Sequence, residues 1–412
     1  MLSRPSGKGP LRAGSALAWA LSVAVSLTAC GGGGGDAEPS KLPGGAPADV
    51  ALSSVAQLGQ KIFHDPSLSA SGRQSCASCH DAAFGHAQPN NLAAQLGGPL
   101  LDQQGGRQSP TIRYLATNKA FYFANDGTPT GGFFWDGRAS SLQDQAGQPF
   151  LNPVEMANGS KDEVIRRLAA ATYAAEFRQV FGDGILGNAE AAFQRVTLAL
   201  QRYQLEDPQF RPFSSKYDAF LLGKIPRLDD QEMRGLALFN NPAKGNCLAC
   251  HPSARGSDGS LPLFTDFSYD SLGVPRNPEL RQNSDPAFFD LGLCARAGDD
   301  LAQRKDLCGL FKVPSLRNVA LRQSLFHNGR FKTLKDALSF YVQRDTNPEK
   351  WYPQNADGSV NKFDDLPQEF HANVNVAEVP YNRKPGDAPA LSDSEIDDVI
   401  AFLKTLTDGY QP

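Results

Sequence analysis

Two copies of one short motif carry the most specific chemistry in the chain. The pattern C-x-x-C-H occurs at Cys76-Ala-Ser-Cys79-His80 and at Cys247-Leu-Ala-Cys250-His251. In this pattern the two thiols add to the vinyl groups of one porphyrin, and the histidine becomes the proximal ligand of its iron. A zinc site would need further histidine or cysteine close by, and a redox dithiol would not need the histidine. The sequence therefore predicts two covalently bound c-type haems.

The segments before the two motifs resemble each other, which predicts a duplicated architecture. Gly59-x-x-Ile62-Phe63-x-Asp65-Pro66 matches Gly235-x-x-Leu238-Phe239-x-Asn241-Pro242, and each runs into its C-x-x-C-H. No segment shows sustained strand alternation. We therefore expect a mostly α-helical fold with two cytochrome c-like domains, residues 49–222 and 223–412, each with one haem and long irregular loops.

Capping signals and apolar periodicity predict where the helices begin. Expected helices span 49–63 with Asp49 as cap, 160–181 from the capping box Ser160-x-x-Glu163, 188–205 after Asn188, and 229–240; two more begin at Thr333 and at Ser392-x-x-Glu395. Segments 85–110 and 252–312 are rich in loop-forming residues and are expected to be irregular.

The N-terminus has the features of an export signal. Arg4, Lys8 and Arg12 precede an apolar segment, 14–29, that is too short to span a bilayer comfortably. It ends in Leu27-Thr-Ala-Cys30, which resembles a bacterial lipoprotein signal, although ordinary signal cleavage nearby is the alternative. The prediction is a signal peptide at 1–29, lipidation of Cys30, and a flexible Gly/Pro-rich tether over 30–48. The protein would then be a membrane-anchored periplasmic lipoprotein.

The remaining cysteines and the charge narrow the class further. Cys294 and Cys308 are left over after lipid and haem attachment, and an exported compartment is oxidising, so a disulfide between them is expected. Two free buried thiols are the alternative. The formal net charge of −4 gives no case for nucleic-acid binding.

Further motifs stand between and after the haem sites. They are Phe134-Trp135-Asp136-Gly137-Arg138-Ala139, Leu142 and Gln145, Pro149-Phe-Leu-Asn152-Pro153-Val-Glu155-Met156, Phe311-Lys-Val-Pro314-Ser-Leu316-Arg317-Asn318 and Phe326-His327-Asn-Gly329-Arg330. Together with the haem motifs they resemble the bacterial di-haem cytochrome c peroxidase/MauG family, over about residues 52–408.

The resemblance implies a division of labour between the haems. The first haem would meet peroxide, the second would store or relay electrons, and Trp135 would lie between them. Gln145, Pro149 and Glu155 match the family's peroxide pocket. Cleavage of the O–O bond needs a proton moved from the inner to the outer oxygen, which one carboxylate can do as base and then acid. By residue type alone, Glu155 could equally cap a loop and Trp135 could be a core residue.

The sixth ligand of the second haem separates two branches of the family. Peroxidases of the reductively activated type use methionine there, whereas the MauG pattern has tyrosine, and the alignment places Tyr341 at this position. The three methionines, Met1, Met156 and Met233, all lie outside this segment. A tyrosinate is an anionic ligand that lowers the haem potential and favours high-valent iron. An inward-facing core tyrosine is the alternative.

In the reductively activated members, a histidine also occupies the open face of the first haem until the second haem is reduced. Here that histidine is missing, because no histidine lies between His86 and Trp135. We therefore expect a first haem that is five-coordinate or water-bound in the ferric state. His64, His86 and His371 are expected at the surface, and His327 occupies a family motif position without an assigned role.

Two departures limit what the resemblance implies. The family's inter-haem calcium positions read Gln108, Arg322 and Ser324, and a cationic arginine makes calcium doubtful. The tryptophan through which MauG draws electrons from its protein substrate falls at Gly245.

The leading hypothesis is an oxidoreductase: a di-haem c-type peroxidase that reduces hydrogen peroxide to water through high-valent, bis-Fe(IV) haems without prior reduction. Its electron donor would be a small cytochrome or cupredoxin. The alternatives are a MauG-like oxidase that modifies side chains of a partner protein, and a non-catalytic di-haem electron carrier.

Overall fold

Helices carry most of the regular structure in residues 51–298 and 300–412, which are those that the computed structural model describes. The strands of this part are two residues long and form three antiparallel pairs, β1–β2, β3–β4 and β5–β6. The helices are α1 (Ser54–His64), α2 (Cys76–Cys79), α3 (Leu142–Leu151), α4 (Lys161–Ala170), α5 (Ala174–Phe181), α6 (Ala189–Glu206), α7 (Lys216–Leu221), α8 (Asp230–Asn240), α9 (Leu334–Gln343) and α10 (Asp393–Lys404). The strands are β1 (Leu96–Gly97), β2 (Gln103–Gln104), β3 (Tyr122–Phe123), β4 (Pro129–Thr130), β5 (Tyr269–Asp270) and β6 (Phe311–Lys312). The predicted mostly helical fold is confirmed.

Helix α1 packs closely across α6. The side chain of Ser53 accepts a hydrogen bond from the backbone N–H of Ala56 and so caps α1. Gly59 lies at the crossing, where an added Cβ would be 1.9 Å from the backbone oxygen of Ala199. Only glycine therefore allows the two helices to come this close.

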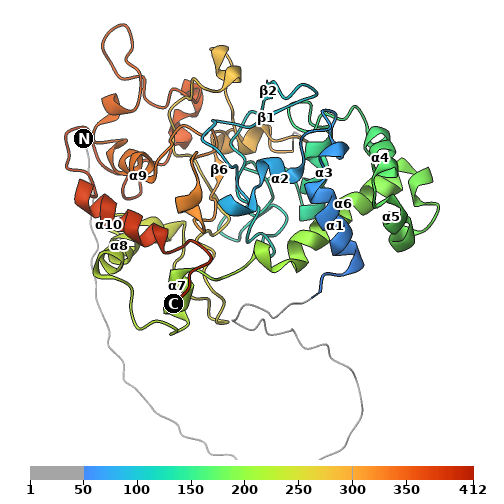
Figure 1. Ribbon diagram of the computed structural model, residues 1–412. Coiled ribbons are helices and arrows are strands. Elements are labelled where there is room, and N and C mark those ends of the chain that lie inside the picture. The colour runs from blue at the N-terminus through green and yellow to red at the C-terminus, as the bar shows by residue number, and fades with distance from the viewer. Residues whose placement is uncertain (1–50, 299) are drawn as a thin grey trace, which may run out of the picture. The chain divides into compact units, whose positions relative to one another are not determined.

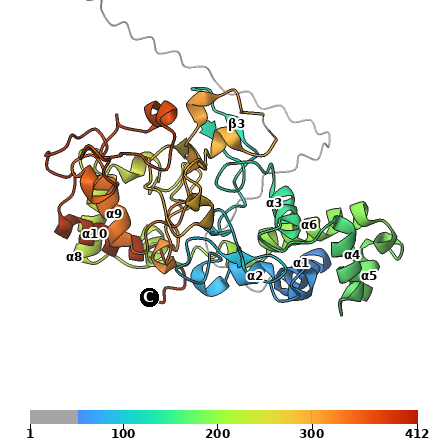
Figure 2. The ribbon, with the colours of Figure 1, turned by 90° about the horizontal axis from the view of Figure 1, so that it is seen from above.

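The second half repeats this crossing with α8 and α10. A Cβ on Gly235 would lie 2.0 Å from the backbone oxygen of Asp398. The two glycines are the first residues of the duplicated sequence segment. The sequence repeat therefore corresponds to the same helix packing in both halves. In Figures 1 and 2, α1 and α3–α6 lie together in one part of the unit, and α8–α10 lie together in another.

The buried apolar side chains form two large clusters that follow the sequence. One runs from Leu58 to Phe210 and the other from Tyr217 to Leu406. Each cluster contains the glycine crossing of its own half and lies beside one haem motif. Burial of these side chains is the main source of stability for both halves.

Two predicted helices need correction. The helix expected over 49–63 begins at Ser54, because Ser53 is its cap. The helix expected over 160–181 is two helices, α4 and α5, separated at Ala171, whose backbone is extended. Tyr173 follows the break, and its hydroxyl donates to Asp65 Oδ2 at 2.6 Å, a long-range contact that periodicity cannot reveal. The helices after Asn188, Asp229, Thr333 and Ser392 are confirmed.

The proposed signal, Cys30, the tether and the predicted cap Asp49 lie outside the described residues. Among the residues that are described, none of the helices combines the length and hydropathy needed to cross a bilayer. A disulfide joins Cys294 to Cys308 in the loop region before β6.

Candidate active site

The first C-x-x-C-H motif forms a short helix with its histidine at the end. Ser75 begins α2 with a capping box that includes Ser78. Cys76 and Cys79 are not in a disulfide, as thioether formation requires. His80 Nδ1 lies 3.2 Å from the carbonyl oxygen of His86. Hydrogen bonding through Nδ1 orients the ring and leaves Nε2 as the nitrogen that can bind iron.

The second motif reaches the same arrangement by a different local route. Asn246 has a left-handed backbone, with φ of 50°, and starts a 3-10 turn over Cys247–Ala249. Cys247 and Cys250 are both free thiols. His251 Nδ1 lies 2.7 Å from the carbonyl oxygen of Phe264, so its Nε2 is likewise the available nitrogen.

A cavity lies beside each motif. The first is lined by Cys76, Cys79, His80, Trp135, Gln145, Pro149 and Glu155. Helix α3 brings Gln145 and Pro149 to one face because they are four residues apart. The adjacent face of α3 is buried through Leu142, Ala146 and Phe150, of which Ala146 also lines the cavity. The three predicted peroxide-pocket residues thus meet at one cavity with the first haem motif.

Glu155 is held at the wall of this cavity. Asn152 Nδ2 donates to Glu155 Oε1 at 2.7 Å. Gly97 packs behind, where a Cβ would lie 2.7 Å from the Glu155 backbone oxygen. Burial raises the pKa of Glu155, while Arg138 and the Asn152 hydrogen bond oppose that shift. A carboxyl group with a raised pKa is suited to proton transfer near neutral pH.

Trp135 lines both cavities and is 8% exposed. Its Nε1–H donates to the carbonyl oxygen of Gln108 at 2.8 Å, and its own carbonyl accepts from Lys312 N at 2.8 Å. Arg107 forms ion pairs nearby with Asp136 and Asp290, at 2.7 and 2.6 Å. These contacts hold the indole rigidly in the wall between the two cavities.

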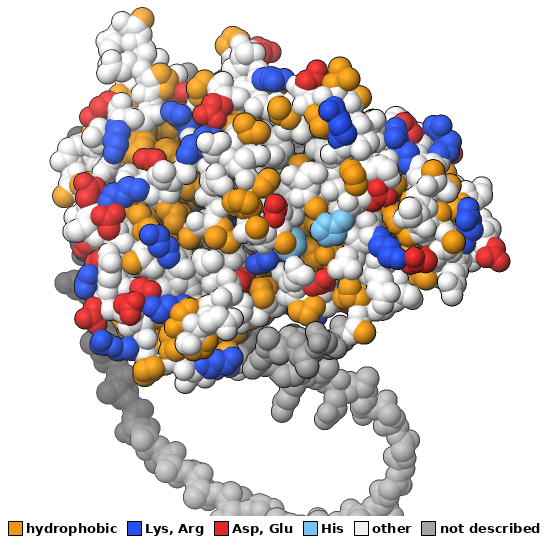
Figure 3. All heavy atoms as spheres, viewed as in Figure 1, with side chains coloured by type: hydrophobic (Ala, Val, Ile, Leu, Met, Phe, Trp, Pro, Cys, Tyr) orange, Lys and Arg blue, Asp and Glu red, His pale blue; other side chains and the backbone are white. Residues whose placement is uncertain are grey.

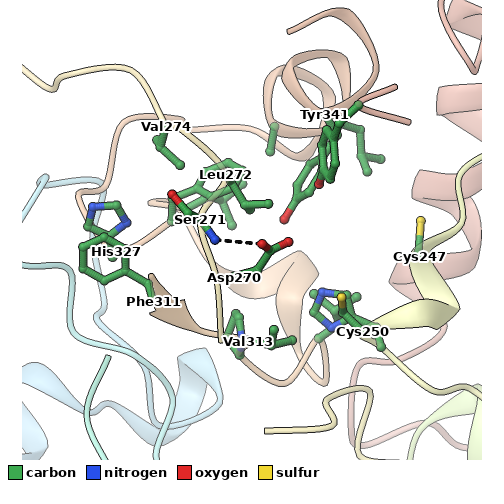
Figure 4. Close-up of a pocket in the computed structure, with 18 of the residues that line it drawn as sticks. Cys247, Cys250, Asp270, Ser271, Leu272, Val274, Phe311, Val313, His327 and Tyr341 are labelled. Carbon is green, nitrogen blue, oxygen red and sulfur yellow. Dashed lines mark hydrogen bonds between the residues drawn. The ribbon is translucent and has the colours of Figure 1, made fainter. Parts of the chain in front are cut away.

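The second cavity is lined by Cys247, Cys250, His251 and Tyr341. Figure 4 shows the Tyr341 ring reaching from α9 into the cavity, with its hydroxyl toward Asp270 and the two cysteines on the facing side. Tyr341 packs against Phe326, with ring centroids 5.5 Å apart. The phenol of Tyr341 therefore lies in the same cavity as His251.

Burial strongly raises the pKa of the Tyr341 phenol, and the neighbouring cysteines and Asp270 add to that shift. Burial also raises the pKa of Asp270, to about 6, against hydrogen bonds from Asn375 and the Ser271 N–H. When the cavity holds no cation, the phenol of Tyr341 is therefore neutral. Only a bound cation, such as ferric iron, would make the phenolate favourable.

The expectation for the histidines was partly wrong. His64 is exposed and His371 is half-buried, but His86 is 2% exposed. The His86 ring stacks on Phe210, and its Nδ1 accepts a hydrogen bond from Arg113 Nε at 3.0 Å. The backbone carbonyl of His86 contacts His80 Nδ1, so the residue is tied into the first motif. His80 is the only histidine among the described residues that line the first cavity.

His327 lies in the second cavity, stacked on Phe311 with ring centroids 3.5 Å apart. Burial lowers its pKa to about 3. It is therefore a neutral ring that fills the cavity wall, and its carbonyl accepts from Gln108 N at 2.8 Å.

The residues at the family's calcium positions all border the second cavity. They are Gln108, Arg322 and Ser324. Arg322 brings a positive charge, and Gln108 Nε2 is buried without a hydrogen-bond partner. Within the described residues, no group of three or more His, Cys, Asp or Glu side chains is arranged to hold a metal ion.

Sequence reasoning overlooked some of the supporting residues. Asn152 lies in the motif Pro149–Met156, three residues before Glu155, and this spacing could have indicated the hydrogen bond between them. Asp270 and Lys312 lie in segments expected to be loop, and nothing local marks them as cavity residues. Gly97 is identified only by what packs against it.

Each of the two cavities contains a C-x-x-C-H motif, and a backbone carbonyl orients the histidine of each motif. This arrangement is typical of a c-type cytochrome with two haem sites. Comparison with known proteins agrees. The family described as di-haem cytochrome c peroxidase (CCP_MauG) matches residues 53–225. The methylamine utilization protein MauG of Paracoccus denitrificans is 38% identical over 377 residues, covering 89% of this chain and 91% of its own.

Other relatives carry peroxidase names. Cytochrome c551 peroxidase of Nitrosomonas europaea is 32% identical, covering 87% of this chain and 81% of its own. The crystal structure of the diheme peroxidase BthA from Burkholderia thailandensis is 38% identical, covers 88% of each chain, and has a TM-score of 0.79. The chain belongs to the di-haem cytochrome c peroxidase family, and it is a haem-dependent oxidoreductase.

Proposed function

We propose that each half of the chain, 49–222 and 223–412, is a cytochrome c-like domain that binds one haem covalently. Cys76 and Cys79 would attach the first haem, and Cys247 and Cys250 the second. The separate apolar clusters and the repeated glycine crossings support this division. The free thiols and the oriented imidazoles fit the group.

We propose that the protein reduces hydrogen peroxide to water at the first cavity. When bound, the haems supply the two electrons that the reduction consumes. Glu155 Oε2 would take the proton from the inner peroxide oxygen and deliver it to the outer one, which leaves as water. Oε1 is held by Asn152, so the carboxylate is already oriented. Gln145 would orient the peroxide, and Pro149 would keep the entrance narrow and apolar.

We further propose that no prior reduction is required. One observation carries this proposal: His80 is the only histidine among the described lining residues of the first cavity, while Tyr341 enters the second. Peroxide would then find the distal side open. Tyr341 would be the second ligand of the iron bound by His251, and its anionic oxygen would favour the oxidised states. Trp135 would carry charge between the cavities.

The test is to mix the fully ferric protein with hydrogen peroxide and to record the haem spectrum. A fast spectral change without any added reductant is expected. A spectrum that changes only after reduction of one haem would refute the proposal. EPR of the oxidised protein should show one high-spin and one low-spin centre, whereas two low-spin centres would indicate an electron carrier.

The 38% sequence identity to MauG favours a second candidate function, that of an oxidase that modifies side chains of a partner protein. Gly245 occupies the position of the tryptophan used in that route, and a glycine cannot relay charge. Oxidation of small electron donors by peroxide, without a covalently altered partner in extracts of the native cells, would support the peroxidase.

We propose export to the periplasm with anchoring through Cys30, because residues 1–30 resemble a lipoprotein signal. The electron donor would be a small cytochrome or cupredoxin. The face in Figure 3 mixes positive and negative side chains without a broad field of either sign, which does not favour a nucleic-acid partner.

A further inference from the structure

Arg322 is a half-buried cation that lines the second cavity and has no acidic partner among the described residues. Its Nη2 donates to the carbonyl oxygens of Ser315 and Arg317, at 2.7 and 3.3 Å. Its Nε is buried without any partner. The described residues place no carboxylate within ion-pair distance of it. Burial alone lowers the pKa of this guanidinium, to about 10.

The other arginines that line the cavities are all paired with carboxylates. Arg113 pairs with Asp408 at 3.2 Å. Arg107 and Arg138 both pair with Asp136, at 2.7 and 3.0 Å. Since these side chains are neutralised within the protein, a bound group is not needed to balance them. Arg322 differs from them in this respect.

Taking a charge out of water without an opposite charge beside it is costly. A protein retains such a charge when a bound group supplies the missing partner. Carbonyl oxygens solvate part of the guanidinium, but they do not cancel its charge. An anion bound in the second cavity would supply the counter-charge that Arg322 lacks.

The charges around the second cavity show where an anion can bind. Its acidic residues are Asp270, Asp290, Asp365 and Glu378, and its basic residues are Lys312 and Arg322. An added anion is repelled by the carboxylates and attracted to the guanidinium. Lys312 also lines the first cavity, but burial lowers its pKa to about 7, so Arg322 is the more certain cation.

From these contacts we infer that the Arg322 guanidinium binds a propionate carboxylate of the haem in the second cavity. This inference rests on the proposed second haem. A guanidinium can donate two parallel hydrogen bonds to one carboxylate, which anchors it and neutralises its charge. Arg322 would then be a cofactor-binding residue that also sets the potential of this haem.

The experiment measures the midpoint potentials of both haems in holoprotein carrying Arg322→Gln or Arg322→Lys. Without the guanidinium, the propionate charge stabilises ferric over ferrous iron. R322Q should therefore shift the second haem to lower potential, and R322K should retain most of the native value. Arg234→Gln is the control with the same charge change, because Arg234 is exposed and pairs only with Asp398.

An unchanged second-haem potential in haem-loaded R322Q would overturn the inference. If R322Q does not accumulate, resonance Raman spectra of wild type and R322K decide the matter. The propionate bending band should shift when a different donor binds the carboxylate, and an identical band would refute the contact. Neither readout depends on peroxide turnover, so failure of the proposed peroxidase activity would be seen separately.

Discussion

Replacing Glu155 by glutamine tests the proton-transfer step most directly. The glutamine amide has nearly the same shape and can still contact Asn152, but it cannot accept a proton and return it. General acid–base catalysis contributes about 10²–10⁴-fold in rate. Glu155 is the only carboxylate besides the ion-paired Asp136 among the described residues that line the first cavity, so nothing else there can replace it. The loss should therefore approach the full range, about 3–5 kcal/mol of activation free energy.

The assay is the second-order rate of reaction between ferric protein and peroxide, measured by stopped flow. Glu190→Gln is the matched control, because Glu190 is exposed on α6 and pairs with Lys161. The wild-type rate should be full above the pKa of Glu155 and fall as the pH drops through it, because the base becomes protonated. Burial raises that pKa, so the fall should begin at higher pH than for an ordinary glutamate. In E155Q this limb should disappear.

A rate for haem-loaded E155Q within a factor of about three of wild type would refute the reasoning. So would an acid limb that persists unchanged in the variant. The haem content of E155Q must match that of wild type for this comparison to hold.

Three further changes test other parts of the structure. Tyr341→Met should raise the potential of the second haem, because a neutral thioether replaces an anionic oxygen; an equal or lower potential in a spectroelectrochemical titration would contradict the assignment. Gly59→Ala should destabilise the holoprotein by about 1–3 kcal/mol, since the new Cβ would meet the backbone of α6. Gly187→Ala, which has no atom within 4 Å of its added Cβ, should leave the thermal unfolding midpoint unchanged. Replacing both Cys294 and Cys308 by alanine should cost about 3 kcal/mol of unfolding free energy through lost loop closure, with unaltered haem spectra; an unchanged denaturant midpoint would argue against it.

Local chemistry explains which features could be predicted from the chain alone. The haem motifs are contiguous, so their thiols and histidines meet whatever the rest of the fold does. Helix starts at Asn188, Thr333 and Ser392 depend on hydrogen bonds within one turn, and they were predicted correctly. The duplicated segments that begin with Gly59 and Gly235 predicted a repeated architecture, and both glycines lie at close helix crossings that need a residue without Cβ.

The tertiary structure decided everything that depends on distant partners. It placed Trp135 against both cavities, buried His86 beside the first motif, and brought the Tyr173 hydroxyl to Asp65 after a break in the predicted helix. It also left Arg322 without an acid beside the second cavity. The sequence determined which groups are present, but charge balance and burial are sums over the whole surroundings. Only the assembled fold brings those surroundings together.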